Sequence, residues 1–512
     1  MFARHHRLRL RPSGGARPAG RKDRPADAAL PGARLSRHRH RRHRGRPEGH
    51  RALGDAPRAR PQLLEPVLPA PRLHQPAPGD PPLLGGPVRT GRPGVPGGGH
   101  DTGERGQQRG GAGLPAARTG AAGMSAHLRE RIAEWVGEQH LATPVQLFSN
   151  ASVADALRRL RDGLDCRISY ALKANTHPLM LQAVRGVDAY NVTNLAHLRT
   201  LLQLRVEPER VTWVNPVIDG PTAQAVLDAG VTRFVVDDTR GLRLLASLTD
   251  RARLTLRLRP ARTGESARSV VRFGALPEEV VELGSLAAER GLEVEALSFF
   301  VGTDTDDLAD AVPYRRALEE AAEVRAKLAA DVGEVPVMNI GGAFPGARRR
   351  FHHDHPDFFH RLREHAQHLL PPGVTLLCEP GRYLAEPALA TLATVVADRV
   401  AGGRRLTHLD VSGYSGLFET TFIEDGGGSL DVVAPERGDP SLTQLVGPIM
   451  DSFDVIKRNA LLPPLVDGDA LLFPNTGAYS YGYTAACEGV RAPHVVPLPA
   501  HLDRALADTW SA

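Results

Sequence analysis

Residues 167–173 read RISYALK, a short and mostly apolar run that ends in a lysine. Seven further runs of this kind follow before residue 380, and helix-like segments such as 150–160 lie between them. The later runs are 187–193 (VDAYNVT), 211–215 (VTWVN), 233–237 (RFVVD), 253–259 (RLTLRLR), 295–302 (EALSFFVG), 335–341 (VPVMNIG) and 374–379 (VTLLCE). Eight strands with helical crossovers predict a parallel β/α barrel of the TIM type. Periodicity alone leaves a doubly wound open sheet as the alternative.

The sequence on either side of these runs has a different pattern of apolar and turn-forming residues. After Glu379, short strand-like runs at 390–396, 406–411, 470–474 and 494–498 alternate with turns rich in Gly, Pro and Asp, which predicts a β domain. Before the runs, Leu128, Ile132 and Val136 share one helical face. We therefore predict a barrel with an N-terminal helix over 124–385, and a C-terminal β domain over 386–512 that includes an exposed loop at 426–428.

The first 123 residues differ in composition from the rest of the chain. They hold 24 Lys and Arg against 8 Asp and Glu, a net charge of +16, so the remainder has 40 basic and 50 acidic residues, a net of −10. They also contain 22 Gly and 18 Pro, and Phe2 is their one aromatic residue. Such a segment buries too little apolar surface to fold. We expect a disordered extension, or an upstream region whose real start codon is Met124.

Several classes of protein are disfavoured by these counts. The basic charge is confined to the extension, notably 37–46 (RHRHRRHRGR), so we expect no nucleic-acid partner. No apolar run reaches about 18 residues, so we expect no membrane span. Three cysteines cannot form a disulfide framework, which indicates a cytoplasmic protein. The histidines of 352–355 (HHDH) lack a defined ligand set, so we expect no metal site there.

Three motifs at the ends of the predicted strands carry chemistry. Lys173 lies among apolar residues in YALKAN (170–175), where desolvation would lower its pKa and favour a Schiff base. The alternative is a lysine that extends to solvent. The glycine turn MNIGGAFPG (338–346) lets backbone N–H groups approach a phosphate. In CEPGR (378–382), Glu379 and Arg382 suit a cofactor with a basic ring nitrogen and a phosphate, although either residue could form a surface ion pair instead.

Together these motifs resemble the fold-type III pyridoxal-phosphate decarboxylases, the group that includes ornithine, diaminopimelate and arginine decarboxylases. Two later motifs agree with this resemblance, GPIMDSFD (447–454) and NTGAY (475–479), and all five occur in the family's order. The resemblance implies a barrel followed by a β domain, pyridoxal 5'-phosphate as cofactor, an amino-acid substrate, and a homodimer with shared active sites. It implies release of the α-carboxylate as carbon dioxide and formation of an amine.

The resemblance also assigns roles to single residues. Lys173 would form the imine with the cofactor, Glu379 would pair with the ring nitrogen, and Asp451 would reach the distal end of the substrate in the partner subunit. Residues placed around the cofactor are Asn191, Arg257, Phe300, Thr303, Gly342, Ala343, Gly381, Arg382 and Tyr479, with Met450 as a catalytic position beside Asp451. Arg272 lies where the family has a basic residue before Phe-Gly.

Four positions depart from the family pattern. Phe300 stands where members usually have a histidine stacked on the cofactor, and Met450 stands where they have a cysteine that helps to protonate Cα. Asn191 and His197 replace an Asp and a Glu, and Ala343 replaces a glycine. The departures favour a specialised substrate, such as an intermediate that carries an amino-acid end. Two alternatives stay open: an amino-acid racemase or epimerase, and a non-catalytic regulatory homologue.

Overall fold

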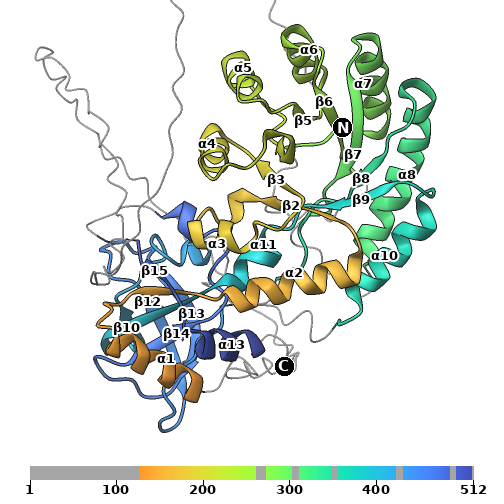
Figure 1. Cartoon of the computed structure of the whole chain (residues 1–512). Coiled ribbons are helices and arrows are strands. Elements are labelled where there is room, and N and C mark those ends of the chain that lie inside the picture. Colours follow the sequence, from red (N-terminus) through yellow and green to blue (C-terminus); the bar gives the residue numbers. More distant parts are fainter. Residues whose placement is uncertain are drawn as a thin grey trace, which may run out of the picture. The chain divides into compact units, whose positions relative to one another are not determined.

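The computed structural model describes residues 126–260, 272–302, 311–346, 355–421, 430–484, 490 and 492–509 (Figure 1). Several predictions concern residues outside these ranges: those on the extension 1–123, Thr303, His352, His353, the loop 426–428 and Cys487.

Eight strands close into a barrel in chain order. They are β2 (Arg167–Ala171), β3 (Ala189–Val192), β4 (Val211–Trp213), β5 (Arg233–Val236), β6 (Arg253–Leu258), β7 (Glu293–Phe299), β8 (Val337–Asn339) and β9 (Thr375–Cys378). Every pair in the barrel is parallel, and β2 pairs with β9 to close it. The predicted barrel is therefore confirmed, and the open sheet is excluded. The strands read as apolar runs because helices cover them outside and side chains fill them inside.

Helices alternate with the strands around the barrel (Figure 1). They are α2 (Asn150–Leu164), α3 (Pro178–Ala183), α4 (Leu195–Gln203), α5 (Gly220–Asp228), α6 (Thr239–Leu248), α7 (Pro277–Glu289), α8 (Val312–Val332), α10 (Phe358–Leu369) and α11 (Arg382–Ala385). The side chains of Asn194, Asp219 and Asp238 cap α4, α5 and α6 by accepting a backbone N–H three residues on. Within the described ranges, no helix has the length and apolarity to cross a membrane.

A seven-stranded, mostly antiparallel sheet forms the β domain. It contains β10 (Leu389–Ala401), β11 (Arg404–Leu409), β12 (Ser441–Val446), β13 (Val455–Leu462), β14 (Ala470–Phe473) and β15 (His494–Pro497), and α13 (Ala500–Asp508) follows. The seventh strand is β1 (Val145–Phe148), which precedes the barrel in the chain and lies between β10 and β15. Each end of the described chain therefore contributes to this domain.

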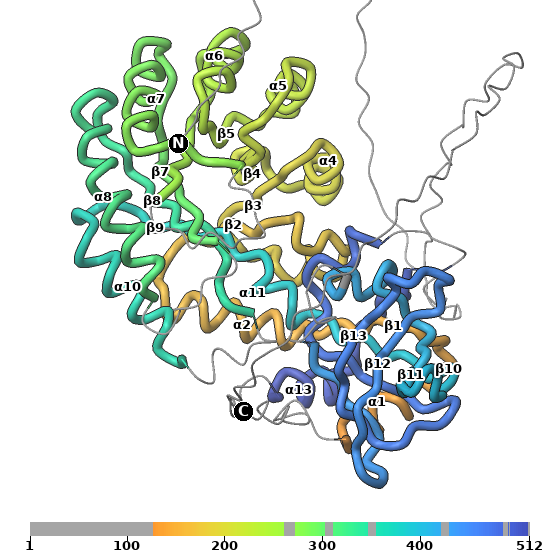
Figure 2. Tube along the Cα trace, turned by 180° about the vertical axis from the view of Figure 1, so that it is seen from behind, coloured from red at the N-terminus to blue at the C-terminus, as the bar shows by residue number. Residues whose placement is uncertain are grey.

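The first helix, α1 (Ala126–Glu138), also packs with the β domain. Its residues Leu128, Ile132 and Val136 are buried in one apolar cluster with side chains of β1, β10, β14 and α13. Figure 2 shows α1, in orange, among the blue elements of the C-terminal part. The helix forms where the sequence predicts it, and its apolar face is covered by the sheet of the β domain.

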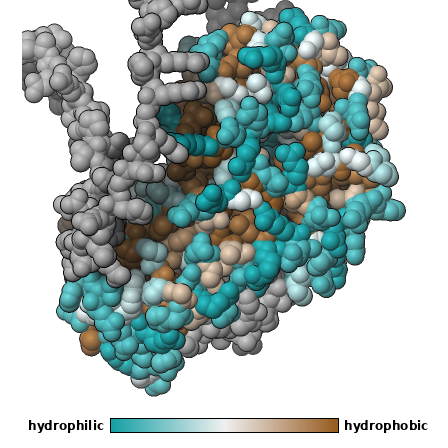
Figure 3. Space-filling view, viewed as in Figure 1, coloured by the Kyte–Doolittle hydropathy of each residue, from teal (hydrophilic) through white to brown (hydrophobic). Residues whose placement is uncertain are grey.

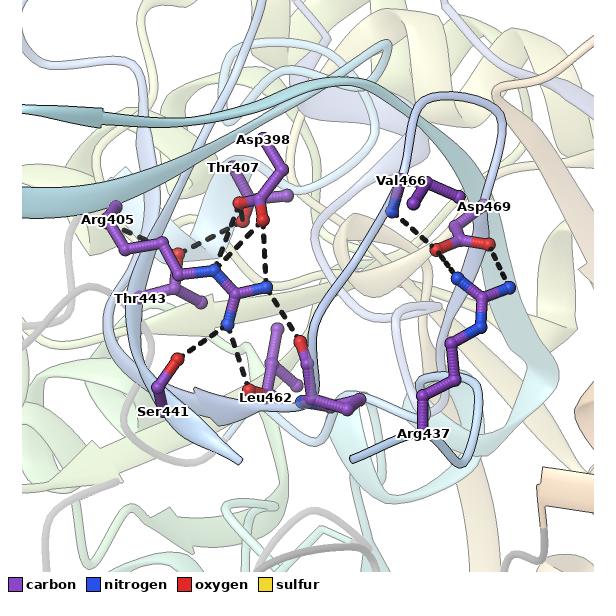
Figure 4. Close-up of polar contacts among 10 residues, drawn as sticks. Asp398, Arg405, Thr407, Arg437, Ser441, Thr443, Leu462, Val466 and Asp469 are labelled. Carbon is purple, nitrogen blue, oxygen red and sulfur yellow. Dashed lines mark hydrogen bonds and ion pairs between the residues drawn. The ribbon is translucent and has the colours of Figure 1, made fainter. Parts of the chain in front are cut away.

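Arg405 is the centre of a polar cluster in the β domain (Figure 4). Its guanidinium pairs with Asp398 at 2.9 Å and donates to Ser441 Oγ and to the carbonyl groups of Leu462 and Pro463. The side chains of Arg405 and Asp398 are 13% and 16% exposed. The cluster therefore ties β10, β11 and the end of β13 together through a single largely buried charge.

We expect Arg405→Ala to lower the free energy of unfolding by about 2–3 kcal/mol, because it leaves a mostly buried carboxylate without its cationic partner and two carbonyls without their donor. Arg253→Ala is the comparison, since Arg253 also pairs with a carboxylate, that of Glu293 at 3.4 Å, but the two side chains are 46% and 58% exposed. This second substitution should lower the free energy of unfolding by less, about 1 kcal/mol. Urea unfolding of both variants measures the difference, and equal costs would contradict this account of Arg405.

Candidate active site

Lys173 lies at the carboxyl end of the barrel, in a single turn, η1 (Leu172–Ala174), that directly follows β2. Its side chain is reached by solvent, yet desolvation by the surrounding protein lowers its pKa. The two observations are compatible if the amine is open on one side and enclosed by protein on the others. The charge of Glu379 raises this pKa, while Arg257 and Arg272 lower it, and the net shift is downward. The lowered pKa shifts this amine towards its neutral, nucleophilic form.

Glu379 follows β9, the strand that pairs with β2, so it lies one strand away from Lys173. Asn339 Nδ2 donates to Glu379 Oε1 at 2.7 Å, and the backbone N–H of Glu379 donates to Gly341 O at 2.7 Å. Oε2 accepts no hydrogen bond from a residue in the described ranges. The carboxylate is therefore fixed through one oxygen and can accept a proton donor at the other.

Two glycines keep the backbone of this end of the barrel closely packed. A Cβ on Gly342 would lie 2.3 Å from Glu379 O, and a Cβ on Gly381 would lie 3.2 Å from Ala174 Cβ. Tyr314 Oη, from α8, donates to Gly342 O at 2.6 Å and helps to fix the turn. The next residue, Ala343, has φ 63°, in the left-handed region that favours glycine. This backbone conformation explains why a glycine suits position 343, where this chain has an alanine.

Asn191 lies inside β3, buried to 3% exposure. Its Oδ1 accepts from Ser169 Oγ at 2.7 Å, and its Nδ2 has no hydrogen-bond partner in the described part of the chain. A buried amide donor without an acceptor is costly, so a ligand oxygen there would be stabilised. His197, the other substituted position, contacts Thr193 Oγ1 at 3.2 Å at the start of α4.

Arg257 and Phe300 lie together on neighbouring strands. Phe300 follows β7 and is 38% exposed, and the Arg257 guanidinium lies 5.8 Å from its ring centroid. Burial lowers the pKa of Arg257, and the charges of Glu379 and Asp237 oppose this shift. Asp237 in turn accepts the N–H of Gly274 at 2.7 Å. The charge of this arginine is therefore stabilised by two carboxylates, and its guanidinium lies beside an aromatic ring that is partly exposed to solvent.

The turn 475–479 from the β domain docks directly beside Lys173. Tyr479 N–H donates to Ala174 O at 2.8 Å, and Asn175 Nδ2 donates to Gly477 O at 2.8 Å. The Tyr479 ring lies 5.0 Å from the Arg382 guanidinium. Figure 3 shows a recess with hydrophobic residues on its walls between the barrel and the β domain. The site is thus built from both domains.

Met450 and Asp451 lie apart from this group, on the loop between β12 and β13. Met450 is 93% exposed and Phe453 is 71% exposed. Asp451 accepts hydrogen bonds from Tyr414 Oη at 3.1 Å and from the N–H of Phe453 at 2.9 Å. In the described chain, no hydrogen bond or ion pair joins Asp451 to a barrel residue. Its predicted role in the partner's site stays a prediction.

Some residues of the site were not predicted from the sequence. Asn339, Asp237 and Tyr314 each fix a predicted residue through a hydrogen bond or a charge. The sequence could have indicated Asn339 as a site residue, because an amide inside an apolar strand is unusual next to a glycine turn. Glu419 is the fourth: it binds Arg382 from the β domain, and nothing in its local sequence, GLFETT, indicated this contact.

We expect Arg272→Gln to raise the pKa of Lys173, because the variant removes a positive charge that disfavours the ammonium form. The rate at which the amine reacts with pyridoxal rises with pH through this pKa, so the midpoint of the rate profile should move to higher pH. Stopped-flow absorbance across pH measures the midpoint. Arg251→Gln, an exposed arginine at the amino end of β6, is the control. An unchanged or lower midpoint in Arg272→Gln would contradict this electrostatic account.

A lysine, a fixed carboxylate and two glycine turns at the carboxyl ends of parallel barrel strands define a class: β/α-barrel proteins that bind pyridoxal phosphate through a lysine. Residues 150–386 match the family described as "Pyridoxal-dependent decarboxylase, pyridoxal binding domain". Over this region the protein is a member of the fold-type III pyridoxal-phosphate-dependent decarboxylases.

Individual relatives agree with this assignment. A probable ornithine decarboxylase of Dictyostelium discoideum is 26% identical over 349 residues, which cover 64% of this chain and 73% of that protein. Antizyme inhibitor 2 of Xenopus laevis is 25% identical over 346 residues, covering 62% and 73%. The crystal structure of the lysine/ornithine decarboxylase of Vibrio vulnificus with putrescine has a TM-score of 0.62 at 25% identity, and covers 72% of this chain and 97% of that one.

The residues present fit pyridoxal phosphate. The unpartnered Nδ2 of Asn191 and the open Oε2 of Glu379 offer a donor and an acceptor on the two sides of β2, the strand that leads to Lys173. Gly342 and Gly381 let the turns after β8 and β9 pack closely at this end of the barrel. Such turns suit a phosphate group.

Proposed function

We propose that this protein removes the α-carboxylate of a basic amino acid, or of a larger intermediate with an amino-acid end, as carbon dioxide. The observation that supports this most is the pairing of β2 with β9. It places an amine of lowered pKa, Lys173, beside a carboxylate, Glu379, held in place by Asn339. Family membership supports the reaction type, and the names of relatives that act on ornithine or lysine support the substrate class.

In this proposal the bound cofactor supplies an electron sink for the charge that decarboxylation leaves on Cα. Lys173 Nζ would hold the cofactor covalently. Glu379 would hold its ring nitrogen and keep it protonated. Phe300 offers a flat apolar face for the ring, and Arg257 lies beside it. The turn 475–479 closes the site from the β domain and limits access of water.

We further propose a homodimer in which Asp451 recognises the distal amine of a substrate in the partner's site. The loop with Met450 and Phe453 supports this, because both apolar side chains are largely exposed and a partner subunit would cover them. Met450 lacks a transferable proton, so another group must protonate Cα. The cysteine count supports a cytosolic location.

A non-catalytic regulatory role is the second candidate. The similarity to antizyme inhibitor 2 favours it, as do Phe300 and Met450 in place of the family's histidine and cysteine. A racemase is disfavoured, because a carboxylate at the ring nitrogen stabilises a fully delocalised carbanion. Such a carbanion suits decarboxylation.

One experiment separates these functions. The purified chain is loaded with pyridoxal phosphate, and its absorbance is followed near about 420 nm, where a lysine imine of the cofactor absorbs. Carbon dioxide release is then measured for ornithine, lysine, arginine, diaminopimelate and their larger conjugates, with chiral chromatography of the remaining substrate. Release of carbon dioxide supports the proposal. Cofactor binding without release supports the regulatory role, and inversion without release supports a racemase.

A further inference from the structure

Arg382 lies at the start of α11, and two carboxylates already occupy much of its hydrogen-bonding capacity. Nη2 and Nη1 donate to the two oxygens of Glu419 at 2.5 and 2.8 Å, and Nη1 also donates to Glu386 at 3.3 Å. Three of the five N–H groups of the guanidinium are thus used. Nε–H and the second Nη2–H, which form one side edge of the group, have no hydrogen-bond partner in the described ranges.

Both carboxylates are shielded from solvent. The side chains of Glu386 and Glu419 are 2% and 13% exposed, and that of Arg382 is 31% exposed. Burial alone would lower the pKa of Arg382, but the hydrogen bonds of Glu419 and the charge of Glu386 more than offset this, so its pKa is raised. The two carboxylates therefore offset the charge of Arg382, in surroundings where water screens charges poorly. An anion that approaches the open edge of Arg382 therefore meets an arginine whose charge is already offset.

Resting on the proposed function, we infer that Glu419 lowers the affinity of the phosphate subsite for the cofactor. It fixes the guanidinium plane of Arg382, and its charge opposes the phosphate group. Backbone N–H groups of the glycine turns then supply most of the phosphate binding, and Arg382 serves mainly to join the barrel to η5 (Phe418–Thr421) of the β domain. Glu419 is a positioning residue in this arrangement, because it acts through Arg382.

The inference predicts that the protein binds pyridoxal phosphate more tightly when the charged side chain of Glu419 is replaced by a neutral one. Glu419→Gln and Glu419→Ser remove the charge, and we expect each to lower the Kd for pyridoxal phosphate by about three- to tenfold. Loss of packing cannot produce this result, because structural damage weakens binding. Pyridoxal, which has no phosphate, should bind all forms with equal Kd. The ratio of the wild-type and Gln-variant Kd values should fall as salt is raised.

The measurement is a spectroscopic titration of each apoprotein with pyridoxal phosphate and with pyridoxal, with circular dichroism to confirm folding. Glu419→Asp keeps the charge and should not bind the cofactor more tightly than wild type. Glu295→Gln is the matched control, because Glu295 makes a comparable two-bond pair with Arg233 at 2.8 and 3.0 Å, near the amino ends of β5 and β7. Its Kd should equal that of wild type.

Two kinds of failure are distinguishable. If the wild-type chain binds neither pyridoxal phosphate nor pyridoxal, the proposed function fails. If the wild type binds the cofactor, but Glu419→Gln or Glu419→Ser binds it equally or more weakly, the inference about Glu419 is wrong. Equal tightening of pyridoxal would also overturn the inference, because the effect would not involve the phosphate.

Discussion

Lys173→Ala is expected to abolish the reducible link between the chain and pyridoxal phosphate and to lower the decarboxylation rate by about a thousandfold or more. The reason is that desolvation by the surrounding protein, aided by the charges of Arg257 and Arg272, lowers the pKa of the Lys173 amine against the opposing charge of Glu379. Borohydride reduction of the loaded wild-type protein, followed by peptide mass spectrometry, should place the cofactor on the peptide with Lys173.

The matched control is Lys327→Ala, which removes an exposed lysine of α8. It should leave both the absorbance band and the label on Lys173 unchanged. Labelling of Lys327 or Lys457 in place of Lys173 would remove the basis of the proposed function. A Lys173→Ala protein that keeps full activity would do the same.

Gly342→Ala is expected to give the second large effect, a loss of about 3 kcal/mol in the free energy of unfolding together with loss of cofactor binding. A Cβ at this position would lie 2.3 Å from Glu379 O and 3.2 Å from Glu379 C. These are backbone atoms, so no side-chain rotation relieves the clash. The turn after β8 or the turn after β9 must move, and Glu379 moves with it.

Gly186→Ala is the control, because a Cβ there meets nothing within 4 Å. Its free energy of unfolding and its Kd for the cofactor should stay close to those of wild type. Thermal unfolding and a cofactor titration measure both quantities. A Gly342→Ala protein with wild-type stability and affinity would show that the two turns are not packed as described.

The barrel could be predicted from the sequence because its strands are buried on both faces and so stand out as apolar runs. The predicted runs overlap all eight strands, and their boundaries either agree or differ by at most three residues. In the β domain, β12 (SLTQLV) and β13 (VIKRNALL) were missed, because polar residues interrupt their apolar runs. The strand β1 was missed because four residues are too few for a period to be recognised.

The residues of the site also divide into those that the local sequence predicts and those that it does not. Residues on motifs at strand ends, such as Lys173, Glu379 and Gly342, could be proposed from local sequence because their chemistry depends on the adjoining turn. Glu419 could not, since its contact with Arg382 spans 37 positions and depends on how the β domain packs. Asp451 is an intermediate case: its motif indicates a role, but the proposal that it serves the partner's site concerns a second subunit, which the fold of one chain does not show.

The position of β1 has a consequence for how the polypeptide matures on the ribosome. Val145 pairs with Leu392 and with His494, so its neighbours emerge hundreds of residues later. The barrel, whose strands pair mostly with the next strand along, can assemble first. The apolar faces of α1 and β1 then stay uncovered until the last strands of the β domain have been synthesised. Contacts so distant along the chain slow folding, and this waiting interval is when the nascent protein is most exposed to aggregation and most in need of a chaperone.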